Sequence, residues 1–426
     1  MNAQLDSAAS SKTFEGRSPP SALDRWLRRR LHAQLEGLTG GRLILRDAVG
    51  TQVFGHAAGK TDLSVAVEVL DPAFYRALAA HGSVGAGEAY IDGLWRCDDL
   101  VALVRLLLRN RASLESMEGG LARLGALALR AWHAGNRNTR SGSRRNIAAH
   151  YDLGNDFFEL FLSSDLMYSS ASWAGAGDDL ETASERKLEV ICRKLGLQAG
   201  DHVLEIGTGW GGFALYAARR HGCRITTCTI SREQYRLASQ RVAQAGLADS
   251  VTVLLKDYRD LEGRYDKLVS IEMIEAVGAR YLETYFAKLG GLLKPDGVAL
   301  LQAITIEDHR YLQALRSVDF IKRFVFPGSF IPSLNAIMTA KTRACDLALI
   351  AQEDFGDSYA RTLRAWRERF LSNLAKVRAL GFDERFIRLW EFYLAYCEGG
   401  FRERSIGVSH LLLAKPGWRR DEIRAP

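Results

Sequence analysis

The 426-residue sequence has no run of about 18 or more uncharged apolar residues, which is the length that a transmembrane helix requires. Residues 1–20 are polar and contain no apolar stretch of the signal-peptide type. A spanning helix and a secretory leader are therefore excluded as first hypotheses. We expect a cytoplasmic protein with a disordered leader over residues 1–20.

Cysteine is scarce and scattered along the chain. The six cysteines form no CxxC pair, and no histidine stands at metal-ligand spacing from them. This pattern argues against a disulfide framework and against a zinc site. We expect reduced thiols and no bound metal.

The chain contains fewer acidic than basic residues. It has 50 aspartates and glutamates and 57 lysines and arginines, which gives a formal charge of +7. A basic excess indicates an anionic partner, either nucleic acid or the anionic leaflet of a membrane. Many basic enzymes, however, carry such an excess on a solvated face. Charge alone does not choose between these alternatives.

The chain divides by composition into four segments. After the leader, residues 21–110 begin with a basic amphipathic helix and continue through short strands and a glycine-broken helix, which predicts a small α+β domain associated with lipid or membrane. The arginines of the first helix suit either a membrane surface or a solvated face. Residues 111–147 contain a helical segment and the basic, polar stretch GNRNTRSGSRRN, which is typical of a linker.

Residues 148–426 alternate apolar strands with helices, which predicts a Rossmann-like α/β domain with a parallel, doubly wound sheet. A mostly helical insertion is expected over 306–348. The last strand, near 406–414, is expected to close the sheet as an antiparallel edge. Strands are expected at 202–207, 224–230, 251–257, 265–273 and 297–304.

The stretch HVLEIGTGWGGFALYAA places glycines directly after a buried strand and before a helix. Glycine permits a tight turn and a close approach to a ligand, and the helix offers free N–H groups. Dinucleotide-binding enzymes use a related GxGxxG pattern, so the glycines alone are only moderately specific. The form LEIGTGWGG looks like the first motif of class I methyltransferases, which favours S-adenosylmethionine over a nicotinamide or flavin. Its candidate cofactor residues are Leu204, Glu205, Gly207, Gly209, Trp210, Gly211 and Gly212.

Five motifs in the same order resemble those of the cyclopropane-fatty-acyl-phospholipid synthases, a family of class I methyltransferases similar to the mycolic acid cyclopropane synthases. They are HYDLGNDFFELFL with MYSSASW, LEIGTGWGG, SIEMIEAVG, FVFPGSFIPS and YCEGGFRER. The resemblance extends from about Gly40 to the end of the chain. It implies further cofactor contacts at Tyr168, Ser169, Thr229, Ser231, Gln234, Asp257 and Tyr258.

The same resemblance implies methyl transfer from S-adenosylmethionine to the cis double bond of an unsaturated acyl chain in a membrane phospholipid, forming a cyclopropane through a carbocation. Aromatic faces in a dry pocket stabilise such a cation. Candidates for this role are Phe158, Tyr168, Trp173, Tyr258 and Tyr359.

In the family a bound bicarbonate serves as the base that removes a methyl proton. Carried over by motif, its holders are Glu275, the backbone at Ile304, and Tyr359. Ser170 stands where the family has cysteine and Gln302 where it has histidine, and neither side chain titrates near neutral pH. The alternative product is therefore a methyl- or methylene-branched chain, or a furan precursor. Glu272 of the same motif competes with Glu275, and the resemblance favours Glu275.

Two other classes compete with this hypothesis. A nucleic-acid methyltransferase lacks support because SIEMIEAVG stands where an NPPY-type motif is expected, so we expect no nucleic-acid partner. A non-catalytic lipid-binding protein is the other alternative. For the enzyme we expect peripheral attachment to the anionic inner face of the membrane, and the family resemblance adds a homodimer.

Overall fold

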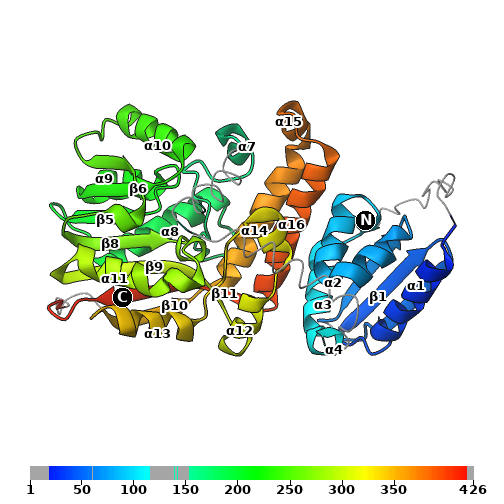
Figure 1. Cartoon of the computed structure of the whole chain (residues 1–426). Coiled ribbons are helices and arrows are strands. Elements are labelled where there is room, and N and C mark those ends of the chain that lie inside the picture. The colour runs from blue at the N-terminus through cyan, green and yellow to red at the C-terminus, as the bar shows by residue number, and fades with distance from the viewer. Residues whose placement is uncertain (1–18, 60, 116–138, 140–141, 143–152, 420–426) are drawn as a thin grey trace.

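The structure is a computed structural model that describes residues 19–59, 61–115, 139, 142 and 153–419 (Figure 1). Most of the expected leader falls outside these ranges, and so do the linker arginines Arg137, Arg140, Arg144 and Arg145. No helix in the described ranges is long and apolar enough to cross a lipid bilayer.

A seven-stranded sheet in the order β10-β11-β9-β8-β5-β6-β7 forms the centre of the larger half of the molecule. The five strands from β9 to β7 are parallel to one another, which is the predicted Rossmann-like arrangement. These strands are β5 (His202–Ile206), β6 (Arg224–Thr229), β7 (Val251–Leu255), β8 (Tyr265–Ile271) and β9 (Leu293–Ile306).

Helices cover both faces of this sheet. Apolar side chains of α8, α9 and α10 pack on one face, and those of α11 and α13 pack on the other. The helices are α8 (Leu180–Leu195), α9 (Gly212–His221), α10 (Arg232–Gln244), α11 (Leu282–Leu292) and α13 (Leu334–Ala344); the short α7 (Asn155–Glu159) precedes them.

The expected edge strand lies one position inside the sheet. Strand β11 (Ile406–Ala414) is antiparallel to β9, as predicted, but β10 (Ala348–Asp354) pairs with its other side and forms the edge. Every residue of β10 is exposed, and its sequence, ALIAQED, does not alternate apolar and polar residues as half-buried strands do. The insertion before it is otherwise helical, with α12 (Asp308–Arg316), a π-helical turn (Ile321–Val325) and α13.

The smaller half is a four-stranded sheet, β2-β1-β3-β4, packed against helices. Its first helix begins with a capping box at Ser21 and buries Leu27 and Leu35, whereas Leu23 and Trp26 remain 52% and 43% exposed. The elements are α1 (Ala22–Leu35), β1 (Gly41–Asp47), β2 (Gly50–His56), β3 (Leu63–Val69), α2 (Ala73–Ile91), β4 (Trp95–Cys97), α3 (Leu100–Arg109) and α4 (Arg111–Glu115).

Helices α14 (Gly356–Ser372) and α16 (Glu384–Arg402) stand between the two halves, with α15 (Leu374–Ala379) joining them (Figure 1). A Cβ on Gly399 of α16 would lie 2.6 Å from Val104 of α3, so the missing side chain lets these helices cross closely. Glu403 forms ion pairs with Arg105 and Arg109 of α3. The two halves are therefore packed together, and residues of both line one cavity.

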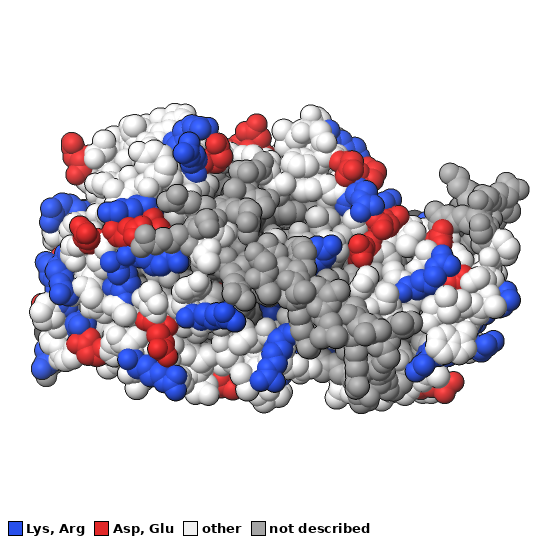
Figure 2. Space-filling view, in the orientation of Figure 1, with Lys and Arg blue, Asp and Glu red and all other residues white. Residues whose placement is uncertain are grey.

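Basic and acidic side chains are interspersed over the coloured part of the face drawn in Figure 2. The formal charge of +7 is therefore not gathered into one basic patch on this visible surface. The coloured residues of this face therefore form no continuous basic stripe of the kind that is typical of a nucleic-acid site.

Candidate active site

The glycine-rich loop joins β5 to α9 in the backbone conformation that the sequence predicts. Gly207, Gly209 and Gly211 have φ angles of 103°, 52° and 86°, which only glycine adopts without strain. The N–H groups of Gly207 and Thr208 donate to the carbonyl of Cys228, tying the loop to β6. A Cβ on Gly209 would meet no atom within 4 Å, so the loop has open space beside it. The loop thus fits a cofactor that approaches the backbone closely.

Leu204 and Glu205 lie inside the sheet, beneath the loop rather than on the cavity surface. Burial raises the pKa of Glu205 to about 8. Its Oε2 atom has no hydrogen-bond partner among the described residues. A buried carboxylate oxygen that lacks a partner is costly, and this favours the neutral, protonated form of Glu205, in agreement with its raised pKa.

Two other predicted cofactor residues have local structural roles. A Cβ on Gly212 would lie 2.8 Å from the carbonyl of Asp165, so glycine is needed here for close packing. Ser231 caps α10, where its hydroxyl accepts from the N–H of Gln234. The side chain of Gln234 in turn accepts from the hydroxyl of Thr229.

A cavity of about 810 Å³ extends from the glycine loop to the small domain. Asp257 faces it with its charge already balanced, because its carboxylate accepts from the Arg259 guanidinium at 2.7 and 2.9 Å. Burial raises the pKa of the neighbouring Tyr258 to about 12. The predicted cofactor residues that line the cavity are Tyr168, Ser169, Gly207, Gly209, Trp210, Thr229, Gln234, Asp257 and Tyr258.

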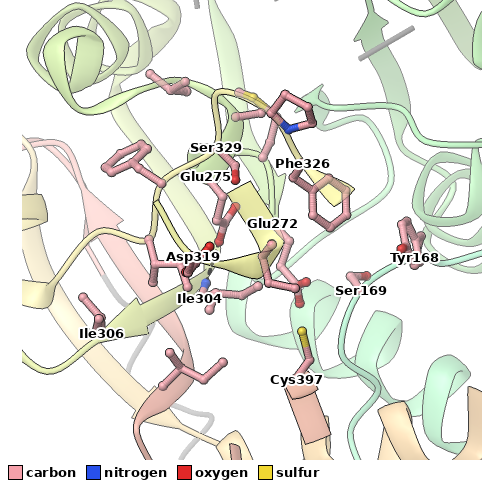
Figure 3. Close-up of a pocket in the computed structure, with 18 of the residues that line it drawn as sticks. Tyr168, Ser169, Glu272, Glu275, Ile304, Ile306, Asp319, Phe326, Ser329 and Cys397 are labelled. Atoms are coloured by element: carbon pink, nitrogen blue, oxygen red, sulfur yellow. Dashed lines mark hydrogen bonds between the residues drawn. The ribbon is translucent and has the colours of Figure 1, made fainter. Parts of the chain in front are cut away.

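A carboxylate centre lies in the same cavity, at the end of β8 (Figure 3). Oε1 of Glu272 accepts from the N–H of Ser170 at 2.8 Å and from the amide of Gln302 at 2.7 Å. Oε2 accepts from the hydroxyl of Tyr359 at 2.7 Å. Three residues that the sequence predicts as anion ligands therefore converge on Glu272, whereas the hydroxyl of Ser170 donates elsewhere, to the carbonyl of Ala171.

The donors to Glu272 are themselves held in place. His410 of β11 contacts Gln302 through Nε2 and Lys194 through Nδ1. Burial and the charge of Lys194 lower the pKa of His410 well below its ordinary value, so the ring is neutral and its Nε2–H donates to the Gln302 oxygen. This leaves the amide nitrogen of Gln302 to face Glu272. Tyr359 stacks on Phe401 with ring centroids 4.4 Å apart.

Glu275 lies one turn beyond Glu272 and faces the cavity from a 3₁₀ turn (Figure 3). Its Oε1 accepts from the N–H of Ile304 at 2.6 Å, and its Oε2 has no hydrogen-bond partner among the described residues. Burial, together with the charge of Glu272, raises the pKa of Glu275 to about 8. The residues predicted to hold bicarbonate thus contact two different carboxylates. Ile304 contacts Glu275, whereas Ser170, Gln302 and Tyr359 contact Glu272.

Of the aromatic side chains suggested for cation stabilisation, Tyr168, Tyr258 and Tyr359 line the cavity. Phe158 is fully buried within an aromatic cluster, and the Trp173 ring lies under Arg361. Phe326, Phe330 and Tyr393 line the cavity as well, and their aromatic faces give its wall an apolar character.

Comparison with known proteins identifies the family. Residues 138–411 match the family of mycolic acid cyclopropane synthetases. The chain belongs to this family. The resemblance seen in the motifs is therefore confirmed, and so is the assignment to the S-adenosylmethionine-dependent class I methyltransferases.

Relatives of known name support the family assignment over most of the chain. A tuberculostearic acid methyltransferase of Mycobacterium tuberculosis is 40% identical over 353 residues, which cover 81% of this chain and 82% of the relative. A cyclopropane-fatty-acyl-phospholipid synthase of Escherichia coli is 37% identical over 351 residues, which cover 82% and 87%. A solved mycolic acid cyclopropane synthase in complex with SAH superposes with a TM-score of 0.60 at 28% identity, covering 64% of this chain and 98% of that one.

The sequence analysis did not predict two residues that lie next to the active site of this member of the mycolic acid cyclopropane synthetase family. Lys187 of α8 is fully buried, and its ammonium donates to the Ser169 hydroxyl at 2.8 Å. Burial lowers the pKa of Lys187 to about 8, although the charges of nearby carboxylates oppose the shift. The sequence feature that could have identified Lys187 is its position among the apolar residues on the buried face of α8. The other residue, His410, interrupts the apolar run of β11.

Proposed function

We propose that the protein transfers the methyl group of S-adenosylmethionine to the cis double bond of an unsaturated acyl chain in a membrane phospholipid, forming a cyclopropane. The observation that carries this proposal is the single cavity that joins the glycine loop to buried carboxylates and then to an aromatic wall. The names of the relatives from M. tuberculosis and E. coli, which refer to fatty-acid methylation and cyclopropane formation, agree with this acceptor.

The chain's own residues supply position and environment. S-adenosylmethionine supplies an electrophilic methyl group on a sulfonium, and the glycine loop with Thr229 and Gln234 would hold it. An alkene is a weak nucleophile, so close and aligned placement of the two reactants is the main contribution to the rate. The addition leaves a positive charge on the acyl chain, which the faces of Tyr168 and Phe326 can stabilise without forming a bond to it.

The far end of the cavity is basic and suits the phosphate of a lipid. Arg111 of α4 and Arg310 and Arg316 of α12 line it there. Asp319 lines the cavity as well, and its charge and those of Arg111 and Arg310 all act on the phenol of Tyr396. Guanidinium groups bind phosphate through charge-assisted hydrogen bonds. A phospholipid whose acyl chain reaches Glu272 would place its headgroup at this end.

We also propose peripheral attachment to the inner face of the membrane, which agrees with this orientation of the lipid. On α12, Leu312 and Leu315 are 60% and 38% exposed beside the basic end of the cavity. Exposed leucines flanked by arginines are typical of helices that lie at a lipid surface. The homodimer remains a prediction from the family.

A methyl- or methylene-branched acyl chain is the second candidate product. It is favoured by Ser170 and Gln302, which replace the cysteine and histidine expected at the anion site, and by the likeness to the tuberculostearic acid methyltransferase. Both products share the first methyl transfer and differ in how the cation is resolved.

The test is to incubate the protein with S-adenosylmethionine and vesicles of a cis-unsaturated anionic phospholipid, and to analyse the acyl chains by gas chromatography and mass spectrometry. We expect a gain of one CH₂ that resists mild hydrogenation, which indicates a cyclopropane. A gain that takes up hydrogen would support the methylene branch. No gain, despite measured cofactor binding, would contradict lipid methylation.

The headgroup contact is tested by Arg316→Gln, with Arg219→Gln on α9 as the matched control, since both arginines are exposed. We expect Arg316→Gln to raise the KM for anionic vesicles several-fold with little change in kcat, because each arginine near an anionic surface contributes about 1 kcal/mol. Equal KM values for both variants would contradict a phosphate site at α12.

A further inference from the structure

The anion that the family resemblance implies does not fit the site as it stands. A bicarbonate held by Ser170, Gln302 and Tyr359 would need their hydrogen-bond donors. All three residues already donate to Glu272, through the backbone N–H, the amide and the hydroxyl. The carboxylate has the same charge and two acceptor oxygens as bicarbonate, so it satisfies these donors in its place.

The backbone of Glu272 is held in an unusual conformation that directs this carboxylate. Its φ is +47°, a left-handed value shared by only Leu166 and Arg404 among the non-glycine residues that the structure describes. Its N–H donates to the carbonyl of Gln302 at 2.7 Å, which fixes the turn at the end of β8. A strained residue of this kind within a reaction cavity is a pointer to function, because a glycine would form the turn without strain.

The surrounding contacts favour a fixed carboxylate over an exchangeable anion. Neutral His410 orients the Gln302 amide, and burial together with the charge of Glu272 raises the pKa of Tyr359 well above its ordinary value, so its hydroxyl keeps the proton that it donates. Hydrogen bonds from Tyr359, Ser170 and Gln302 to the ionised form oppose the rise in the pKa of Glu272 that burial causes. The three donors hold the Glu272 carboxylate at the cavity wall, where it is placed to accept a proton.

We propose that Glu272 is the internal base of the reaction and replaces bicarbonate in this chain. In the first step the alkene electron pair forms the bond to the methyl carbon, the carbon–sulfur bond breaks with its electrons remaining on sulfur, and the neighbouring acyl carbon becomes cationic. Glu272 then takes a proton from the new methyl group. The released C–H electron pair closes the ring, or forms a methylene group if a hydride has first moved to the cationic carbon. Glu272 returns the proton to solvent when the product leaves.

This inference rests on the proposed lipid methylation, and its test uses two substitutions and a control in the full chain. Glu272→Gln keeps the size of the side chain but cannot accept the proton. Glu272→Gly removes the side chain, relieves the positive φ and frees the three donors for an external anion. Glu283→Gln, at an exposed glutamate on α11, is the matched control.

Turnover is measured in buffer stripped of carbon dioxide and again with millimolar bicarbonate. We expect the wild type and Glu283→Gln to be equally active in both buffers. Glu272→Gln should lose roughly 100-fold or more in turnover, the usual contribution of a general base. Glu272→Gly should be inactive without bicarbonate and should regain at least about tenfold with it.

A readout without substrate separates the role of Glu272 from the activity itself. Bicarbonate should raise the melting temperature of Glu272→Gly but not that of the wild type, because a ligand stabilises only a protein with a free site for it. Adding Tyr359→Phe to Glu272→Gly should weaken this shift. If the wild type makes no methylated lipid, the proposed function fails, and the melting shift still decides whether Glu272 fills the anion site.

Two results would overturn the proposal. One is a wild-type turnover that falls about tenfold when bicarbonate is removed, since the base would then be external. The other is a bicarbonate-induced melting shift that is as large in the wild type as in Glu272→Gly.

Discussion

The two ends of the reaction cavity are built in different ways. The cofactor end is formed by backbone, with glycine φ angles and N–H contacts within one short loop. The carboxylate end is formed by the Glu272 side chain just after β8, by side chains of β9, β11 and α14, and by the backbone N–H of Ser170, which are distant in the sequence. Cofactor binding should therefore depend on the backbone conformation of the glycine loop, whereas the chemistry at Glu272 should depend on the hydrogen-bond network around it.

The largest effect should come from disturbing the backbone end with Gly207→Ala. Residue 207 has a φ of 103°, and its added Cβ would approach Met273 Cγ at 3.2 Å. Strain of this kind costs about 1–3 kcal/mol, so the affinity for S-adenosylhomocysteine should fall up to roughly 100-fold. Calorimetric titration measures the change.

The control for this variant is Gly175→Ala, because a Cβ at that glycine meets nothing within 4 Å and its φ is ordinary. Cofactor affinity in the control should match the wild type. If Gly207→Ala also binds the cofactor normally, the loop does not act through its glycine conformation.

The same contrast explains what the sequence could predict. The strand–glycine–helix order of 202–221 is local, and the structure has β5, the glycine loop and α9 in this order, with β5 one residue shorter than expected. Which of Glu272 and Glu275 accepts the hydrogen bonds of Ser170, Gln302 and Tyr359 cannot be predicted from the local sequence. It depends on the turn at φ +47° after β8, and on donors that reach the site from other elements. The edge strand β10 was missed because its sequence, four apolar residues followed by three polar ones, does not show apolar–polar alternation.

A smaller effect is expected at the side-chain end from Tyr359→Phe, which removes the 2.7 Å hydrogen bond to Glu272. A hydrogen bond to a charged group contributes about 1.5–3 kcal/mol, so turnover should fall roughly 10- to 100-fold. The pKa of Glu272 should rise further, and the acid limb of the rate–pH profile should move to higher pH. The affinity for S-adenosylhomocysteine should stay the same.

Tyr216→Phe is the matched control, because Tyr216 donates to Glu189 at 2.9 Å, a tyrosine–glutamate contact between α9 and α8. It should leave both turnover and the pH profile unchanged. A Tyr359→Phe enzyme with reduced turnover but an unshifted profile would indicate that Tyr359 supports only the fold.

The smallest effect concerns Glu275, and it appears in stability rather than in rate. Its pKa is raised from 4.5 to about 8, so the folded state binds this proton more tightly than the unfolded state. The resulting stabilisation is fully present below pH 4.5 and is lost as the pH rises toward 8.

Glu275→Gln keeps an oxygen for the Ile304 N–H and carries no charge at any pH. Its melting temperature relative to the wild type should therefore increase between pH 5 and 8, by about 2–4 °C per kcal/mol of stabilisation lost in the wild type. A difference that stays constant over this range would contradict a raised pKa at Glu275 and would assign the protonated carboxyl of the pair to Glu272.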